Sequence, residues 1–248
     1  MDTYFRMFQL IKRSLDPENI GEFDPVEIMC DFETAAHNAV CLTYPATEVK
    51  GCFFHLCQSV RRYADQHGMR AALAENDEIN RLRKMLTALA FLPVEQVGPA
   101  FDELQELQHT TAPVLDELFE YFGRTYVGRK QRVGRRSKPD FAISIWNVHD
   151  RVLHNLPRTN NSVEGWHNAF KNSVTAQKPV IFKFIERIRK EEELTQYKLS
   201  QAAAGKTTKL TRKKYRQINT NLLRLVESYR ADETESIPFL RSISHNIS

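Results

Sequence analysis

The sequence predicts an α/β protein that is mostly helical overall, and three features of its hydrophobic pattern lead to this prediction. Near the N-terminus, two apolar runs of strand length, residues 26–30 and 48–54, alternate with helical stretches at 32–42 and 55–67. Residues 75–122 then hold three helical stretches separated by prolines. Further helical patterns continue to the C-terminus. A β-α-β-α order is typical of part of an α/β sheet, so we expect a small sheet that carries a large all-helical insertion.

Local signals set the expected boundaries of each element. Apolar residues from Tyr4 to Leu15 recur at helical spacing, and Asp16-Pro17 ends that helix. Asp31 follows the first strand, and Gly68 closes the helix at 55–67. The remaining helices are expected at residues 75–92, 94–107, 112–122, 146–156, 162–172, 180–204, a stretch ending near Tyr229, and 237–247.

The pattern divides the chain into four expected parts. These are 1–68, a partial α/β core; 69–156, an all-helical insertion; 157–204, returning core helices that carry Glu164; and 205–248, a basic helical C-terminal extension.

Composition narrows the class of protein. The chain has 248 residues, of which 42% are hydrophobic and 27% charged, as in ordinary soluble domains. It contains no apolar stretch near the ~18 residues of a membrane span, so we expect no membrane partner. The four cysteines, Cys30, Cys41, Cys52 and Cys57, all lie in the first quarter, a distribution that favours reduced thiols over a disulfide framework.

Charge is unevenly distributed along the chain. Residues 85–123 contain acids but no lysine or arginine, whereas residues 124–138 contain seven basic residues and no acid. A second basic stretch spans 206–216. Such basic blocks contact phosphates or act as nuclear localisation signals, but they are equally typical of solvated loops and helix faces.

Three strings of residues, taken in order, carry a family resemblance. They are Asp31-Phe-Glu-x-Ala, Gly51-Cys-Phe-Phe-His55-Leu-Cys-Gln58, and Leu156-Pro-Arg-Thr-Asn-Asn-Ser-Val-Glu-Gly-Trp-His167. Together with the first helix and the Trp146-Asn-Val segment, they resemble the Mutator-like (MULE) transposases of the DDE superfamily. The resemblance covers nearly the whole chain. It implies an RNase H-like core, N-terminally truncated here, with a large all-α insertion.

The resemblance implies metal-binding roles for two acids. Asp31 matches the second carboxylate of the catalytic triad and Glu164 matches the third. In such enzymes three carboxylates hold two Mg²⁺ ions about 3.5–4 Å apart, and hard oxygen ligands suit this ion. The complete domain would cleave and join DNA at transposon ends and target sites in the nucleus. The family's first catalytic Asp lies upstream of the first helix, so we expect this chain to be catalytically incomplete.

Both acids also have structural interpretations. Asp31 would serve as the N-cap of the following helix, and Glu164 lies in the first turn of a helix, where a carboxylate favours the helix dipole. Each interpretation is the default for that residue alone.

Cys52 and His55 match the family's C-x₂-H element. A zinc site would need two more ligands, and His149 and His154 are the nearest candidates. Residues five apart on a regular helix point about 140° apart, so His154 could join only if its helix ended there. We therefore favour a packed, hydrogen-bonded His55 over a zinc ligand.

Several side chains are candidate nucleic-acid contacts. Trp166 would stack on a base or, as we favour, pack with Phe170 in the core. The candidate phosphate contacts are Arg129, Lys130, Arg132, Arg135, Arg136, Arg158 and Lys171.

Three functions are consistent with these patterns. The first is the transposase lineage. The second is a transposase-derived protein that binds DNA or chromatin without cutting it. The third is a helical interaction module that docks a partner on the acidic segment 95–120, and a homo-oligomer is compatible with all three.

Overall fold

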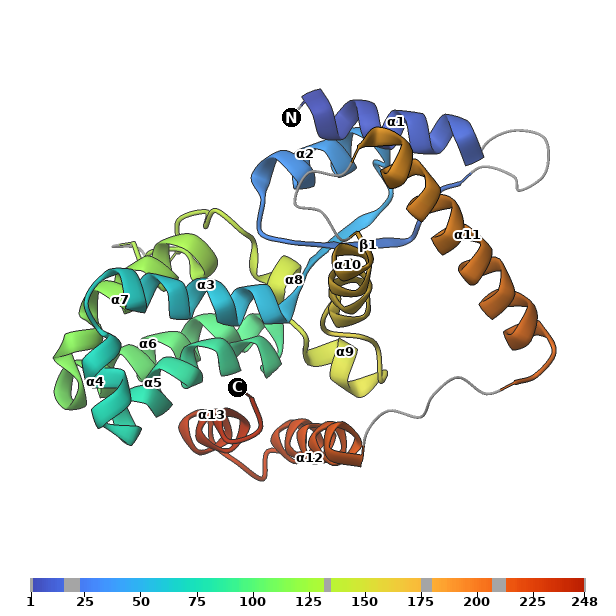
Figure 1. Cartoon of the computed structure of the whole chain (residues 1–248). Coiled ribbons are helices and arrows are strands. Elements are labelled where there is room, and N and C mark those ends of the chain that lie inside the picture. Colours follow the sequence, from blue (N-terminus) through green and yellow to red (C-terminus); the bar gives the residue numbers. More distant parts are fainter. Residues whose placement is uncertain (1, 16–22, 132–134, 175–179, 207–212, 248) are drawn as a thin grey trace. The chain divides into compact units, whose positions relative to one another are not determined.

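The computed structural model describes residues 2–15, 23–131, 135–174, 180–206 and 213–247. The chain forms two compact units, one of Met1–Thr159 with Ile218–Ser248 and the other of Asn160–Gln217. Both units are mostly helical (Figure 1). Among the described residues, no helix is both long and apolar enough to span a bilayer.

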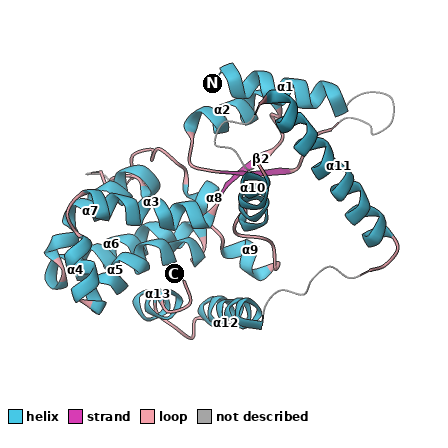
Figure 2. Ribbon diagram, viewed as in Figure 1, coloured by secondary structure: helices cyan, strands magenta, loops and turns pink. Residues whose placement is uncertain are grey.

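A two-stranded parallel sheet lies in the first unit and positions the candidate site. Strands β1 (Glu27–Cys30) and β2 (Glu48–Gly51) pair in a register that sets Glu27 beside Glu48 and Cys30 beside Gly51. They are the magenta segments of Figure 2. Both predicted strands are therefore present, but the second ends at Gly51 rather than at residue 54, because α3 begins at Phe53. The described residues add no third strand to this sheet, and the RNase H-like core stays a prediction.

Three helices flank the sheet. Helix α2 (Thr34–Thr43) connects the strands, and α3 (Phe53–Gln66) begins two residues after β2. Helix α1 (Asp2–Leu15) packs on α2, and the Tyr4 hydroxyl donates a 2.7 Å hydrogen bond to Glu33 Oε2. The β-α-β-α order expected from the hydrophobic pattern is present.

The rest of the first unit is a helical bundle. Its elements are α4 (Arg70–Glu75), α5 (Asp77–Ala88), α6 (Val94–Thr111), α7 (Asp116–Phe122), α8 (Ile143–Trp146), α9 (His149–Leu153), α12 (Lys213–Arg230, from Ile218 onward) and α13 (Ser236–Ser244), with short turns at Leu89–Phe91, Pro113–Leu115 and Gly123–Val127. Aromatic side chains fill the core, and the Trp146 indole donates a 2.9 Å hydrogen bond to the Tyr126 carbonyl. Helix α13 packs on α5, so the end of the chain is part of this core rather than an extension from it.

Two predicted helix boundaries are wrong. The helix expected at 146–156 is two helices, because Asn147 interrupts it: its Nδ2 donates to the Leu92 carbonyl at 2.7 Å, and its Oδ1 accepts from the His149 amide at 3.0 Å. The helix expected to follow Asp31 directly starts three residues later, at Thr34. In both cases side-chain or turn hydrogen bonds replace the helical pattern.

The second unit consists of α10 (Asn161–Ser173), α11 (Ile181–Ala203) and the first turn of α12. Trp166 stacks on Phe170 with ring centroids 5.2 Å apart, and its indole donates a 3.0 Å hydrogen bond to Glu191 Oε2. Trp166 thus packs against Phe170 as favoured, but it stays 42% exposed rather than buried in a core.

Candidate functional site

Asp31 lies where β1 delivers it, at the carboxyl end of the sheet. It is not the helix cap that one interpretation suggested, since Glu33 occupies the N-cap position of α2. The Asp31 carbonyl instead accepts from the Glu33 amide at 2.8 Å and lies 2.7 Å from His37 Nε2. These contacts hold the backbone and leave the carboxylate 56% exposed.

His55 meets Asp31 across the same edge of the sheet. The Cys52 amide donates to the Cys30 carbonyl at 3.0 Å, which continues the strand pairing by one residue. Helix α3 then starts, and its first turn brings His55 Nδ1 to within 2.7 Å of Asp31 Oδ1. Because parallel strands end at one edge, two strings far apart in the sequence come together there.

Cys52 has a different role from its neighbour in the C-x₂-H element. Its side chain is fully buried, whereas that of His55 is 21% exposed. The structure therefore brings His55, and not the Cys52 thiol, to the solvent-facing carboxylate.

A glycine makes room for the ring that lies beside the site. A Cβ atom on Gly51 would lie 2.5 Å from Phe32 Cζ, so the Phe32 ring packs directly over the end of β2. Phe32 contacts Tyr126 and Phe141 edge to face, with centroid distances of 5.6 and 5.1 Å. The residue after Asp31 thereby anchors the strand end to the bundle.

Arg158 also reaches this edge. Its carbonyl accepts a 2.9 Å hydrogen bond from the Phe53 amide, at the start of α3. Its guanidinium lies 5.8 Å from the centre of the Phe91 ring and donates to Asn219 Oδ1 at 2.7 Å. Burial lowers the pKa of this guanidinium. Arg158 is thus engaged within the fold, and its predicted contact with DNA phosphate stays a prediction.

Glu164 belongs to the second unit. It lies in the first turn of α10, is half-buried, and its amide donates to the Asn160 carbonyl at 3.1 Å. Lys171 is exposed near the end of the same helix. The structure describes this helix separately from the sheet that carries Asp31, so the pairing of the two acids stays a prediction.

The residues present fit a magnesium site in part. An exposed carboxylate such as that of Asp31 is a suitable oxygen ligand. Over the described part of the chain, however, no three His, Cys, Asp or Glu side chains gather into a metal-binding group. The second and third oxygen ligands are therefore not assembled around Asp31 within the first unit.

The predicted zinc ligands lie in contrasting surroundings. Helix α9 does end just before His154, as a zinc site would require. His149 is nevertheless buried with its Nδ1 2.9 Å from Asp150 Oδ1, while His154 is exposed with its Nδ1 2.8 Å from the Asp150 carbonyl. His149 is therefore packed in the core while His154 lies at the surface, and zinc remains a prediction.

The basic segment 124–138 contains a short hairpin-like loop. The Gln131 amide donates to the Arg135 carbonyl at 2.8 Å, and the Ser137 amide to the Arg129 carbonyl at 2.9 Å. Gly128 permits the turn into this loop, because its φ is +90° and a Cβ there would lie 2.1 Å from the Ser137 carbonyl oxygen. Arg129, Lys130 and Arg135 are exposed.

Not every cation of this loop faces solvent. Arg136 donates 2.8 Å hydrogen bonds to the Gly98 and Gly128 carbonyls and pairs with Asp102. Lys130 Nζ lies 3.1 Å from the same Asp102 carboxylate. Arg132 lies outside the described residues. The loop thus presents Arg129 and Arg135 to solvent, while Arg136 fastens it to α6.

Comparison with known proteins identified no similar protein. Neither the family models, nor the curated proteins, nor the solved structures gave a match to this chain.

Two contacts of the β1 segment, one beside Asp31 and one at the opposite end of the strand, were not anticipated from the sequence. His37 supports the Asp31 carbonyl, and the buried Arg151 of α9 pairs with Glu27 at the start of β1. A single histidine or arginine within a helical pattern carries no signal for either contact, although the first joins residues only six apart and the second residues 124 apart. Only the packing of α9 beside the sheet reveals the second one.

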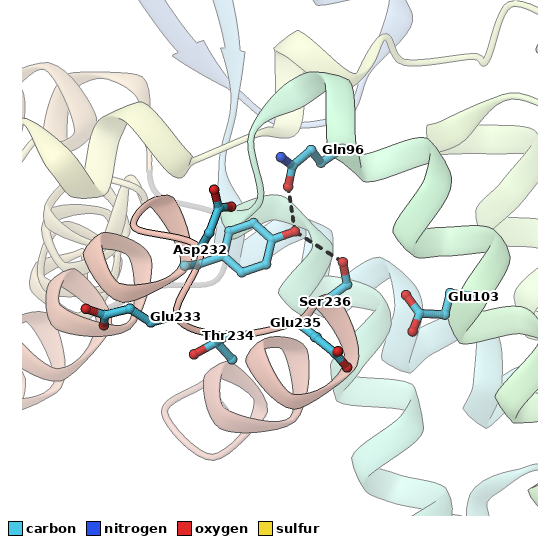
Figure 3. Close-up of a pocket in the computed structure, with 8 residues that line it drawn as sticks. Gln96, Glu103, Asp232, Glu233, Thr234, Glu235 and Ser236 are labelled. Atoms are coloured by element: carbon cyan, nitrogen blue, oxygen red, sulfur yellow. Dashed lines mark hydrogen bonds between the residues drawn. The ribbon is translucent and has the colours of Figure 1, made fainter.

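A separate acidic cavity of about 750 Å³ opens between α6, the end of α12 and the start of α13 (Figure 3). Its lining includes Glu103, Asp232, Glu233 and Glu235. The Tyr229 hydroxyl lies within it and hydrogen-bonds Gln96 and Ser236. None of the residues predicted to bind metal or DNA lines this cavity.

Proposed function

We propose that this chain is part of a Mutator-like DDE transposase domain and that Asp31 and Glu164 bind Mg²⁺ in it. The observation that carries the proposal is the carboxylate of Asp31, which is solvent-exposed at the end of a parallel strand. It lies 2.7 Å from His55 of the C-x₂-H element that follows the neighbouring strand. Two of the strings that carry the resemblance therefore meet in space.

The arrangement supports metal binding for a chemical reason. A strand end holds the Asp31 backbone rigidly, and the exposed carboxylate retains access to ions and water. When bound, Mg²⁺ would polarise a phosphodiester and its attacking oxygen. In the complete domain we propose DNA cleavage and strand transfer in the nucleus, with DNA as the partner.

Titration with Mn²⁺, followed by electron paramagnetic resonance, tests the metal assignment. Mn²⁺ prefers the same oxygen ligands as Mg²⁺ and reports bound and free ion directly. We expect Asp31→Asn and Glu164→Gln each to weaken binding at least tenfold. The matched control is Asp65→Asn, which removes an exposed carboxylate of α3 that lies 4.0 Å from Arg61 Nε. Unchanged Mn²⁺ affinity in both site variants would reject the assignment.

A second candidate is DNA binding without cleavage. Its support is the loop that presents Arg129 and Arg135 to solvent beside the exposed Lys138. Cations on such a loop would contact phosphates without reading bases, so affinity would fall steeply with salt.

Fluorescence anisotropy with a random-sequence duplex at several salt concentrations tests this candidate. The double variant Arg129→Ala/Arg135→Ala should bind more weakly and show a shallower salt dependence. Arg61→Ala/Arg62→Ala removes two exposed cations from α3 and serves as the control. Equal losses in both double variants would indicate a diffuse charge effect and count against a binding loop.

A further inference from the structure

Arg83 of α5 is a buried cation whose hydrogen bonds go to a neutral group. Only 8% of its surface is exposed. Its Nε and Nη2 atoms both donate to the side-chain oxygen of Asn80, at 3.1 and 2.9 Å. Within the described part of the chain its Nη1 atom donates to no group, and this nitrogen is not closed off from solvent. Because buried charges are normally paired, the amide of Asn80 leaves the charge of Arg83 uncompensated.

A second cation lies next to Arg83 on the same helix. Lys84 is partly buried, and its Nζ donates to the Ile247 carbonyl at 3.3 Å. Burial lowers the pKa of Lys84, and the charge of Arg83 lowers it further. Among the described residues, neither cation forms an ion pair with a carboxylate. An anion beside the two side chains would relieve the repulsion between them.

Helix α3 packs against α5 and adds to this positive region. Burial raises the pKa of the Cys57 thiol on α3 to about 11, while the nearby charges of Arg83 and Lys84 act to lower it. The pKa of Arg83 is lowered by burial and then by the charge of Arg61, one turn after Cys57. In the part of the chain that the structure describes, Asp65 is the acid that acts on Arg83, and its carboxylate lies 4.0 Å from Arg61 Nε. Three cations are thus balanced by one carboxylate.

We propose that Arg83 and Lys84 bind a phosphate group at the contact between α3 and α5. Guanidinium and ammonium groups form strong charge-assisted hydrogen bonds with phosphate oxygens. Arg83 Nη1 carries two N–H donors, and Lys84 Nζ has two beyond the one that meets Ile247. The small exposed fraction of Arg83 favours a phosphate group that is free or terminal on a small molecule over the continuous backbone of DNA.

This site is independent of the proposed transposase function. Neither Arg83 nor Lys84 belongs to the predicted metal ligands or to the basic loop at 124–138, and both lie within the first unit. Failure of the metal assignment would therefore leave the phosphate site untouched.

Thermal unfolding of the full chain in sodium phosphate, compared with sodium chloride of equal ionic strength, tests the proposal. Phosphate stabilises many proteins by exclusion from their surface, so the rise in melting temperature is compared between variants. An anion that binds only the folded state adds to this rise, and we expect the rise in the wild type to exceed that in Arg83→Met by about 2–4 °C. Arg81→Met is the matched control, because it removes a cation of α5 that pairs with Glu78 and should keep the full rise.

Isothermal titration calorimetry with inorganic phosphate measures binding directly. The wild type and Arg81→Met should bind with equal affinity, and Arg83→Met and Lys84→Met should each bind at least tenfold more weakly. Lys84→Met alters a partly exposed position and keeps the test valid if Arg83→Met does not fold. A wild type that binds no phosphate, or undiminished binding in Lys84→Met and in a folded Arg83→Met, would overturn the proposal.

Fluorescence anisotropy with a random-sequence duplex distinguishes the two sources of a phosphate group. We expect Lys84→Met to lose phosphate binding and to keep its affinity for the duplex, which would assign a small phosphate-bearing ligand. Weaker duplex binding in Lys84→Met, but not in Arg81→Met, would instead assign the phosphate group to the DNA backbone.

Discussion

His55 Nδ1 and Asp31 Oδ1 lie 2.7 Å apart, although the two residues are 24 positions apart in the chain. Each residue follows a strand of the same parallel pair, so their contact comes directly from the β1–β2 register. The contact distinguishes Asp31 from an ordinary helix cap, because the carboxylate faces the helix that follows the other strand.

This pair should contribute little to stability. The Asp31 side chain is 56% exposed, and solvent screens exposed ion pairs to about 0–1 kcal/mol. Asp31→Asn and His55→Gln should each change the free energy of unfolding in urea by less than about 1 kcal/mol. A loss above about 2 kcal/mol would assign the pair a structural role.

Gly51→Ala should destabilise the first unit. The added Cβ would lie 2.5 Å from Phe32 Cζ, and Tyr126 and Phe141 restrict the movement of that ring. We expect a cost of about 1–3 kcal/mol in the free energy of unfolding.

A double-mutant cycle in urea denaturation checks the cause. In a Phe32→Leu background, Gly51→Ala should cost clearly less, because the ring that it meets is gone. Equal costs in both backgrounds would show that Phe32 is not the obstacle.

Replacing each of two adjacent arginines with alanine should change the stability of the protein by different amounts. Arg136→Ala removes hydrogen bonds to the Gly98 and Gly128 carbonyls and the ion pair with Asp102, so it should destabilise the protein by about 1–3 kcal/mol. Arg135→Ala removes an exposed side chain and should change stability by less than about 0.5 kcal/mol. Thermal unfolding of the two variants measures the difference, and a similar melting temperature for both would contradict the assigned contacts.

Cysteine reactivity should separate Cys41 from Cys57. Cys41 is exposed, whereas burial raises the pKa of the Cys57 thiol to about 11. At pH 8, iodoacetamide should therefore modify Cys57 at least about a hundredfold more slowly than Cys41, because only the thiolate reacts. Mass spectrometry of peptides after timed quenching gives both rates.

The same raised pKa predicts a pH-dependent contribution to stability. The neutral Cys57 thiol favours the folded state below pH 9.0, its ordinary pKa, and this contribution is lost as the pH rises to about 11. The free energy of unfolding should therefore fall less between pH 8 and 10.5 in Cys57→Ala than in the wild type. An identical fall in both proteins would contradict the burial of this thiol.

Much of the local structure follows from the sequence. Strands form within the runs at 26–30 and 48–54, as Glu27–Cys30 and Glu48–Gly51, and the helical spacing of Tyr4 to Leu15 marks a helix. The break within 146–156 could not be predicted, because it depends on a hydrogen bond from Asn147 to Leu92, far away in the chain. The late start of α2 has a local origin instead, the turn in which the Glu33 amide donates to the Asp31 carbonyl.

The sequence predicted individual residues of the candidate site but not the contacts between them. The position of Asp31 after a strand pointed to the edge of a sheet, and the C-x₂-H element pointed to His55. The support from His37 and the link from Arg151 to Glu27 have no local signal. The sequence also could not distinguish Arg135 from Arg136, since neighbours in a basic run look alike until the fold gives one of them hydrogen-bond partners.

The sequence by itself determined the period of each element, the position of Asp31 directly after a strand and that of His55 at the start of the helix after the other strand. Those properties depend on side chains a few residues apart, which one segment contains. Only the tertiary structure decided that Asp31 faces His55 and that Arg136 fastens a loop to α6. Such contacts join residues distant in the chain, so they depend on how the packed elements meet rather than on the pattern within any one of them.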